Sequence, residues 1–161
     1  MGSITTSSVV VAGVALALTA CARPHISPIT PPPYRAVVAA SYDTTWKAII
    51  RSLARQNLPL RAVARDSGVI ATDEFVAPIN LYADCGQVKG DQLEGEALVS
   101  FTLFLEADGN QTRVQVNSKM RTQAHRRGSS GKLSADPVYP CASTDKFEAN
   151  LLDAVRDLVK E

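Results

Sequence analysis

Three cysteines are the residues of this chain whose types allow specific chemistry, because a thiol can carry a lipid, form a disulfide or act as a nucleophile. A nucleophilic cysteine needs a neighbouring base, and the sequence has two histidines, His25 among prolines and His125 in a segment rich in Gly, Ser and Arg. Neither has a group to orient it, and two isolated histidines cannot supply a metal site. We therefore expect a protein that is not an enzyme, with no metal and no cofactor.

The first cysteine, Cys21, ends an unusual N-terminal segment. Residues 1–20 carry no charged side chain, and residues 9–20 form an apolar run that is shorter than the roughly 20 residues of a membrane-spanning helix. Such a run is typical of a secretory signal peptide. Leu18-Thr19-Ala20-Cys21 resembles the bacterial lipobox, in which the cysteine receives a diacylglycerol and becomes the first residue after cleavage. This resemblance implies that Cys21 is lipidated and anchors the chain to a membrane.

Two other interpretations of this segment remain open. One is a plain signal peptide or anchor helix. The other is N-myristoylation, because Met1-Gly2 with Thr6 fits a loose acylation pattern. The lipobox interpretation explains both the apolar run and the cysteine at its end. Ala22 is not the aspartate that retains lipoproteins in the inner membrane of enterobacteria, so we expect the periplasmic face of the outer membrane.

The other two cysteines, Cys85 and Cys141, form an even pair in a chain that we expect to be exported. Oxidising compartments favour disulfides, and neither cysteine stands in an apolar core setting, since Asp84 and Gly86 flank Cys85, and Pro140 and Ala142 flank Cys141. We therefore predict a Cys85–Cys141 disulfide. Two buried free thiols are the alternative.

Charged residues offer weaker signals. The chain has 17 Lys and Arg against 16 Asp and Glu, and this balance does not favour a nucleic-acid-binding domain. The adjacent carboxylates of Asp73 and Glu74 would point to opposite faces of a strand, so we interpret them as solvated strand ends. A local basic patch comprises Arg121, Arg126, Arg127 and Lys132, with His125. It either contacts an anionic partner, such as the phosphate groups of lipid, or is simply a solvent-exposed loop that keeps the domain soluble.

Ahead of the folded part, residues 24–33 hold five of the nine prolines. Proline favours extended polyproline II structure at about 3.1 Å per residue, which predicts a stiff spacer that holds the domain roughly 40 Å from the membrane. His25 is interpreted as a solvated residue of this spacer. We expect three parts: a signal peptide (1–20), a lipidated Pro-rich tether (21–35) and a single domain (36–161).

Within the domain, residues 36–40 are short and apolar and predict a strand. Apolar residues at helical spacing over 42–56 predict an amphipathic helix, capped by Ser41 or Asp43, with Trp46 in its core face. Residues 60–65 and 69–76 flank the turn Asp66-Ser67-Gly68 and predict a β-hairpin. A short strand is expected at 81–86.

The clearest β pattern is the alternation of apolar and polar residues over 97–105 and 112–121, joined by a hairpin loop at 107–110. The second strand has an entirely polar face, so one side of the sheet must be wet. A final helix follows, with Asp145 and Glu148 in a capping-box pattern and an apolar stripe of Phe147, Leu151, Ala154, Val155 and Leu158. The predicted order is β-α-β-β-β-β-β-α. The expected fold is α+β, an antiparallel sheet packed on a long C-terminal helix in the helix-grip arrangement.

Short motifs in this domain resemble those of BamC-like outer-membrane lipoproteins. The motifs are Ser41-Tyr42-Asp43 with Trp46 and Leu53, and Asp66-Ser67-Gly68-Val69-Ile70 with Thr72-Asp73, followed by a hairpin and a capped helix. The resemblance implies a helix-grip domain, outer-membrane anchoring and no catalytic residues. The chain departs from the family in having one such domain, a shorter N-terminal segment and the pair Cys85 and Cys141.

From these features we expect a lipid-anchored, non-enzymatic interaction module in a cell-envelope complex, with a protein partner in the envelope. The groove beside the C-terminal helix and the basic patch are its expected contact surfaces. The alternative is a carrier of a small ligand or lipid, with a cavity between helix and sheet. A tightly filled helix–sheet interface would favour the first function.

Overall fold

A computed structural model describes residues 25–88, 90–122, 126–127, 133–134 and 137–161. Within them the chain forms two helices and a set of mostly antiparallel strands. The helices are α1 (Tyr42–Arg55) and α2 (Lys146–Lys160). The strands are β1 (His25–Ile26), β2 (Tyr34–Val38), β3 (Leu60–Ala64), β4 (Val69–Thr72), β5 (Phe75–Pro78), β6 (Ala83–Asp84), β7 (Gln87–Val88), β8 (Asp91–Gln92), β9 (Glu96–Asp108), β10 (Gln111–Thr122), β11 (Arg126–Arg127), β12 (Leu133–Ser134) and β13 (Pro140–Ser143).

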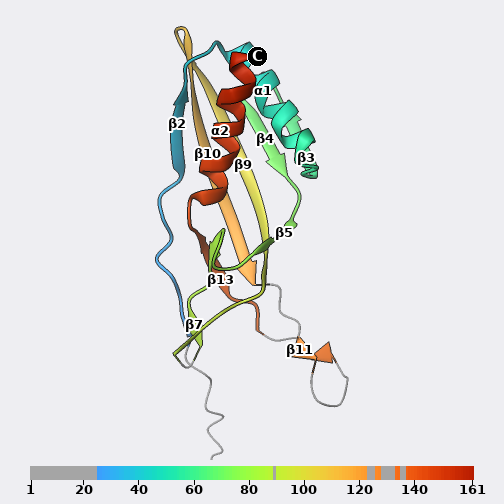
Figure 1. The fold of residues 1–161 in the computed structure, drawn as a ribbon, viewed down its shortest axis with the longest axis vertical. Coiled ribbons are helices and arrows are strands. Elements are labelled where there is room, and N and C mark those ends of the chain that lie inside the picture. Colours follow the sequence, from blue (N-terminus) through green and yellow to red (C-terminus); the bar gives the residue numbers. More distant parts are fainter. Residues whose placement is uncertain (1–24, 89, 123–125, 128–132, 135–136) are drawn as a thin grey trace, which may run out of the picture.

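The long hairpin of β9 and β10 runs along most of the molecule, and β7 and β11 lie beyond its open end (Figure 1). Its register is unbroken from the pair Gln111 and Asp108 to the pair Thr122 and Ala97. The alternation seen in the sequence is the reason, since one face must be buried along its whole length. The buried face includes Val99, Phe101, Leu103, Val114 and Val116, each no more than 2% exposed.

Other strands extend the sheet on both sides of this hairpin. β4 and β5 pair with β9, β3 pairs with β4, and both β2 and β13 pair with β10. The predicted turn at 66–68 is confirmed, with Gly68 at a φ of 68°. The predicted strand 69–76 is interrupted at Asp73 and Glu74, and the two halves pair with β9 in registers that differ by one residue.

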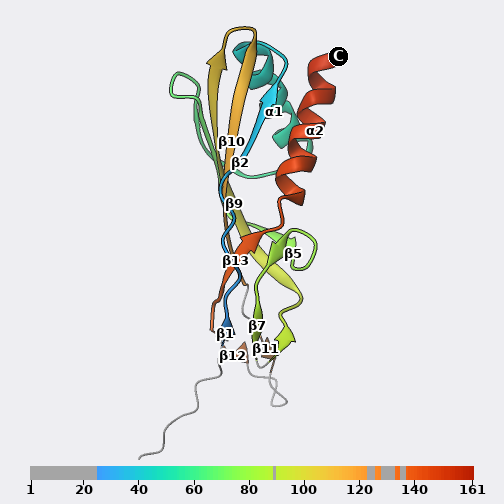
Figure 2. The same ribbon diagram turned by 90° about the vertical axis from the view of Figure 1, so that its left-hand side faces the viewer.

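Both helices pack on one face of the sheet (Figure 2), so the opposite face is open to water. The core between them includes Ile49, Leu53, Leu151 and Leu152, all at most 1% exposed. Trp46 is 7% exposed and belongs to this core, as predicted. The expected α+β fold, an antiparallel sheet packed on a C-terminal helix, is confirmed.

Two expectations need correction. The folded unit starts before residue 36, because β1 pairs with β7 and thereby includes His25 and Ile26. Part of the expected free tether is thus packed on the domain. The predicted capping box is also wrong, because Asp145 precedes α2 with a φ of 61° and makes no side-chain cap, while Glu148 is bonded elsewhere.

Candidate functional site

Two strands, β2 and β13, pair with the same edge of β10 but do not meet, and a groove opens between them. β2 pairs with β10 up to Val116, and β13 pairs with it from Met120 onward. The groove has a volume of about 230 Å³. We call it the edge groove; its lining comprises Thr30, Pro31, Pro32, Pro33, Val116, Asn117, Ser118, Cys141, Ala142, Ser143, Asp145 and Glu148.

Backbone groups of β10 also face this groove. The Thr122 amide donates to the Tyr139 carbonyl, 2.9 Å away, on the β13 side. Because alternate residues of a strand direct their backbone groups to the same edge, those of Ser118 point to the groove. Neither β2 nor β13 supplies a residue opposite Ser118. Pro31, Pro32 and Pro33 pass nearby, and proline has no amide N–H to donate.

A buried carboxylate closes the inner end of the edge groove. Glu148 is only 1% exposed. The Ser118 hydroxyl donates to its Oε1, and the Ser143 hydroxyl donates to its Oε2 over 2.9 Å. Glu148 lies in the first turn of α2, where the helix dipole favours a negative charge. The two serines come from β10 and β13, so this carboxylate joins three elements.

Asp145 places a second carboxyl group at the same groove. Its pKa is raised, first by partial burial and then by the nearby charge of Glu148. Its amide donates to the Ser143 hydroxyl over 3.0 Å. The groove thus combines two acidic groups with proline rings, which suits a cationic side chain rather than an anionic one.

The predicted disulfide lies next to this groove. Cys85 and Cys141 are bonded in the structure, and Cys141 lines the groove. The bond links the region of β6 to β13, which also pair with each other. Cys21 lies outside the described residues.

Of the predicted basic patch, the structure describes one side chain, that of Arg121. Arg121 forms a bidentate ion pair with Glu74, at 2.9 and 2.7 Å. This pair raises the pKa of the Arg121 guanidinium and lowers the pKa of the Glu74 carboxyl. Arg126 and Arg127 form β11, but their side chains, like Lys132 and His125, lie outside the described residues. Glu74 is therefore an ion-pair partner rather than a simple solvated strand end.

The interpretation of His25 as a solvated residue is wrong. Its ring stacks on Tyr139 with centroids 4.0 Å apart, and its Nε2 lies 2.9 Å from the Cys85 carbonyl oxygen. Beside it, the Ile26 carbonyl oxygen lies against Gly86. A Cβ atom on residue 86 would be only 1.9 Å from this oxygen. The residues around His25 carry no periodic signal for this contact, since β1 has two residues.

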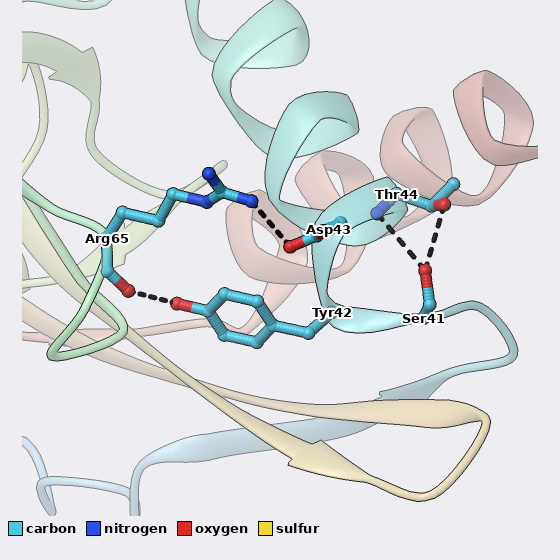
Figure 3. Close-up of polar contacts among 5 residues, drawn as sticks. All are labelled: Ser41, Tyr42, Asp43, Thr44 and Arg65. Carbon is cyan, nitrogen blue, oxygen red and sulfur yellow. Dashed lines mark hydrogen bonds and ion pairs between the residues drawn. The ribbon is translucent and has the colours of Figure 1, made fainter.

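The residues that carry the motif resemblance have a structural role (Figure 3). Tyr42 donates from its hydroxyl to the Arg65 carbonyl, and Asp43 pairs with the Arg65 guanidinium at 2.6 Å. Ser41 caps α1 by accepting from the Thr44 amide at 3.4 Å. These contacts fix the start of α1 to the β3–β4 turn.

Two shallow hollows lie on the open face of the sheet, with volumes of about 470 and 280 Å³. The larger mixes Val37 and Phe104 with charged side chains of Arg35, Glu106 and Arg113. Among the residues that the structure describes, no group of three or more His, Cys, Asp and Glu is placed to hold a metal ion. Neither helix of the described chain has the length and apolar character needed to cross a membrane.

No family model and no curated protein matches this chain. Among solved structures, it is similar to a DUF4468 family protein from Bacteroides ovatus ATCC 8483. The identity is 13%, the TM-score is 0.34, and the match covers 56% of this chain and 58% of the other. The chain therefore matches little more than half the length of that protein.

Proposed function

We propose that this protein is a lipid-anchored module of the bacterial cell envelope that binds a partner protein and carries out no catalysis. The lipobox at Cys21 supplies the anchor. The edge groove, which reaches the start of α2, supplies the contact surface.

The observation that carries this proposal is the uncovered stretch of β10 at Ser118, flanked by the carboxyl groups of Glu148 and Asp145. A strand edge with free backbone groups can bind an extended peptide segment. A groove of about 230 Å³ holds one side chain of such a segment, and its carboxyl groups favour a Lys or Arg. The expected partner is thus an envelope protein that presents a basic residue.

The packing between helix and sheet supports a binding module over a carrier. The rings of Phe101 and Phe147 lie 4.6 Å apart, and Phe147 also contacts Phe75 and Tyr82. Leu151 and Val155 of α2 are at most 1% exposed. These side chains fill the space that a bound lipid would need.

Photo-crosslinking in intact cells tests the contact surface. A photo-reactive residue at Thr30, which is exposed and lines the edge groove, should give one discrete adduct. The charge reversal Asp145→Lys should abolish this adduct, whereas Asp153→Lys, on an exposed position of α2, should retain it. Equal adducts in both variants would contradict the proposal.

Fractionation tests the anchor separately. Replacement of Cys21 by Ser should leave an uncleaved, unlipidated precursor. Unchanged processing together with unchanged membrane association would refute the lipobox interpretation, whatever the crosslinking shows.

A further inference from the structure

The first described residues of the chain lie at one end of an elongated molecule. β1, β7 and β11 gather at the end opposite to the C-terminus (Figures 1 and 2). We call this the β1 end. His25 is held there by Tyr139 and the Cys85 carbonyl, and Ile26 pairs with Gln87. The chain is therefore fixed to the domain from residue 25 onward.

This attachment leaves a short connection to the proposed lipid on Cys21. Four residue steps separate Cys21 from His25, and an extended chain spans at most about 3.6 Å per residue. The connection therefore reaches no more than about 14 Å. The expected spacer of roughly 40 Å is not available, and the β1 end must stay beside the membrane surface.

Large apolar side chains are exposed in this part of the molecule. Ile26 is 63% exposed and Val138 is 53% exposed. Each of them is next in sequence to a residue of the stack between His25 and Tyr139. Ile29, three residues further along, is 93% exposed. Each of these side chains leaves its apolar surface in water unless something covers it.

We propose that Ile26, Ile29 and Val138 insert into the interfacial layer of the phospholipid bilayer and orient the domain on the membrane. The proposal rests on the lipid anchor of the proposed function, because the reach from Cys21 identifies the bilayer as the surface that covers these residues. The strength of such interfacial binding increases with the apolar area that is buried in the bilayer. Asp91 of β8, opposite Val88 at the same end, limits the insertion to a shallow depth.

The orientation has a consequence for the edge groove. Thr30, next to Ile29, lines that groove, so the groove opens close to the membrane surface. A partner that reaches it must itself lie near the membrane.

Fluorescence quenching by brominated lipid tests the insertion. The full-length, lipidated protein is reconstituted in vesicles of phosphatidylethanolamine and phosphatidylglycerol with brominated acyl chains. Separate variants carry Ile26→Trp, Ile29→Trp or Val138→Trp, and Val63→Trp is the matched control. Val63 is 51% exposed but lies on β3, away from the β1 end. The native Trp46, 7% exposed, gives the same background in every variant.

We expect brominated vesicles to quench the fluorescence added by Ile26→Trp, Ile29→Trp and Val138→Trp, and to leave the fluorescence added by Val63→Trp unchanged. Equal quenching in all four variants, or quenching in none, would overturn the proposed orientation. All four positions are exposed, so we expect each variant to keep the fold. Circular dichroism of each variant checks this.

Cell fractionation separates this proposal from the one on which it rests. If Cys21→Ser leaves an uncleaved, unlipidated precursor while the three test variants remain unquenched in vesicles, the anchor stands and the insertion is wrong. If Cys21→Ser leaves both processing and membrane association unchanged, the lipid anchor itself is wrong.

Discussion

At the scale of single residues, Glu148 shows how one carboxylate can join distant segments. Its two oxygens accept from Ser118 and Ser143, and its burial leaves no water to replace a lost partner. Disrupting a buried, hydrogen-bonded carboxylate lowers the free energy of unfolding, because removing either the carboxylate or one of its hydroxyl donors leaves a buried polar group unpaired.

Replacement of Glu148 by Ala should therefore lower the free energy of unfolding by about 2–4 kcal/mol. Glu148→Gln, which keeps an acceptor oxygen, should lose less. The matched control is Asp153→Ala on the exposed face of α2, expected to change stability by less than about 1 kcal/mol. Urea denaturation measures all three, and equal losses for Glu148→Ala and Asp153→Ala would contradict the structural role.

The pair of Arg121 and Glu74 predicts a specific response to pH. Arg121 holds the pKa of Glu74 below its usual range, mainly through the hydrogen bond between them. A depressed pKa in the folded state means that the pair contributes stability above the unfolded-state pKa of Glu74. That contribution is lost as the pH falls through the folded-state pKa.

In Arg121→Gln the pKa of Glu74 should rise toward its ordinary value. A carboxyl titration followed by NMR measures this shift directly. Arg113→Gln, which removes a guanidinium paired with Glu106 and Asp108 on the same face, is the control and should leave Glu74 unchanged. An unaltered Glu74 titration in Arg121→Gln would show that the ion pair does not form in solution.

Residue-level prediction from the sequence succeeds where local spacing is sufficient. Ser41 caps α1 and Trp46 lies in the core, as the helical pattern indicates. The spacing of Glu148 from Asp145 fits a capping box, but the contact that forms is a different one. Its partner Ser118 is 30 residues away in the sequence, so only the tertiary fold determines that contact.

At the scale of elements, long periodic segments are predictable and short ones are not. β9 and β10 have 13 and 12 residues, enough for alternation to stand out. β1 and β7 have two residues each and no such pattern. They pair because the fold brings them together, and the edge groove depends on where β2 ends and β13 begins, which no local pattern specifies.

Gly86 provides a test of the contact between β1 and β7. It has a φ of 75°, and a Cβ there would lie 1.9 Å from the Ile26 carbonyl oxygen. Gly86→Ala should displace β1 and lower the free energy of unfolding by about 2–4 kcal/mol. Gly109→Ala is the control, because Gly109 also has a positive φ, 60°, but has nothing within 4 Å of a Cβ.

The control should lose only about 1 kcal/mol, from backbone strain alone. Hydrogen exchange should show faster exchange at β1 and β7 in Gly86→Ala and unchanged exchange there in Gly109→Ala. The same exchange pattern in both variants would mean that β1 is not held against Gly86.

At the scale of the whole molecule, the fold class follows from the sequence because each amphipathic face requires a cover. The sheet has one dry face, and two helices each have one apolar stripe, so they must pack together. The start of the domain is predicted too late because a run of prolines is typical of a free spacer. Proline fixes the local backbone, but it does not prevent the neighbouring residues from docking.

The disulfide is expected to stabilise the molecule mainly by restricting the unfolded chain. Cys85 and Cys141 are separated by 56 residues, and the loop-entropy model gives about 4 kcal/mol as an upper value for this length. The double variant Cys85→Ser with Cys141→Ser should lower the free energy of unfolding by up to this amount. Denaturation of the oxidised and reduced wild-type protein provides the comparison.

If reduction leaves the stability of the wild-type protein unchanged, the two cysteines are not bonded in solution. Mass spectrometry without reducing agent gives an independent answer, since the bonded form lacks two thiol hydrogens. Two free thiols in the protein purified without reducing agent would contradict the disulfide.

The three prolines beside β10 affect whether neighbouring copies of this protein can associate through their strand edges. An uncovered strand edge invites other chains to add to the sheet and aggregate, and proteins anchored in a membrane meet one another far more often than proteins in solution. Pro31, Pro32 and Pro33 line the groove next to Ser118 without amide donors of their own. They leave room for the short extended segment of a partner but limit how much of a second strand can pair with β10, which disfavours edge-to-edge polymerisation of neighbouring copies.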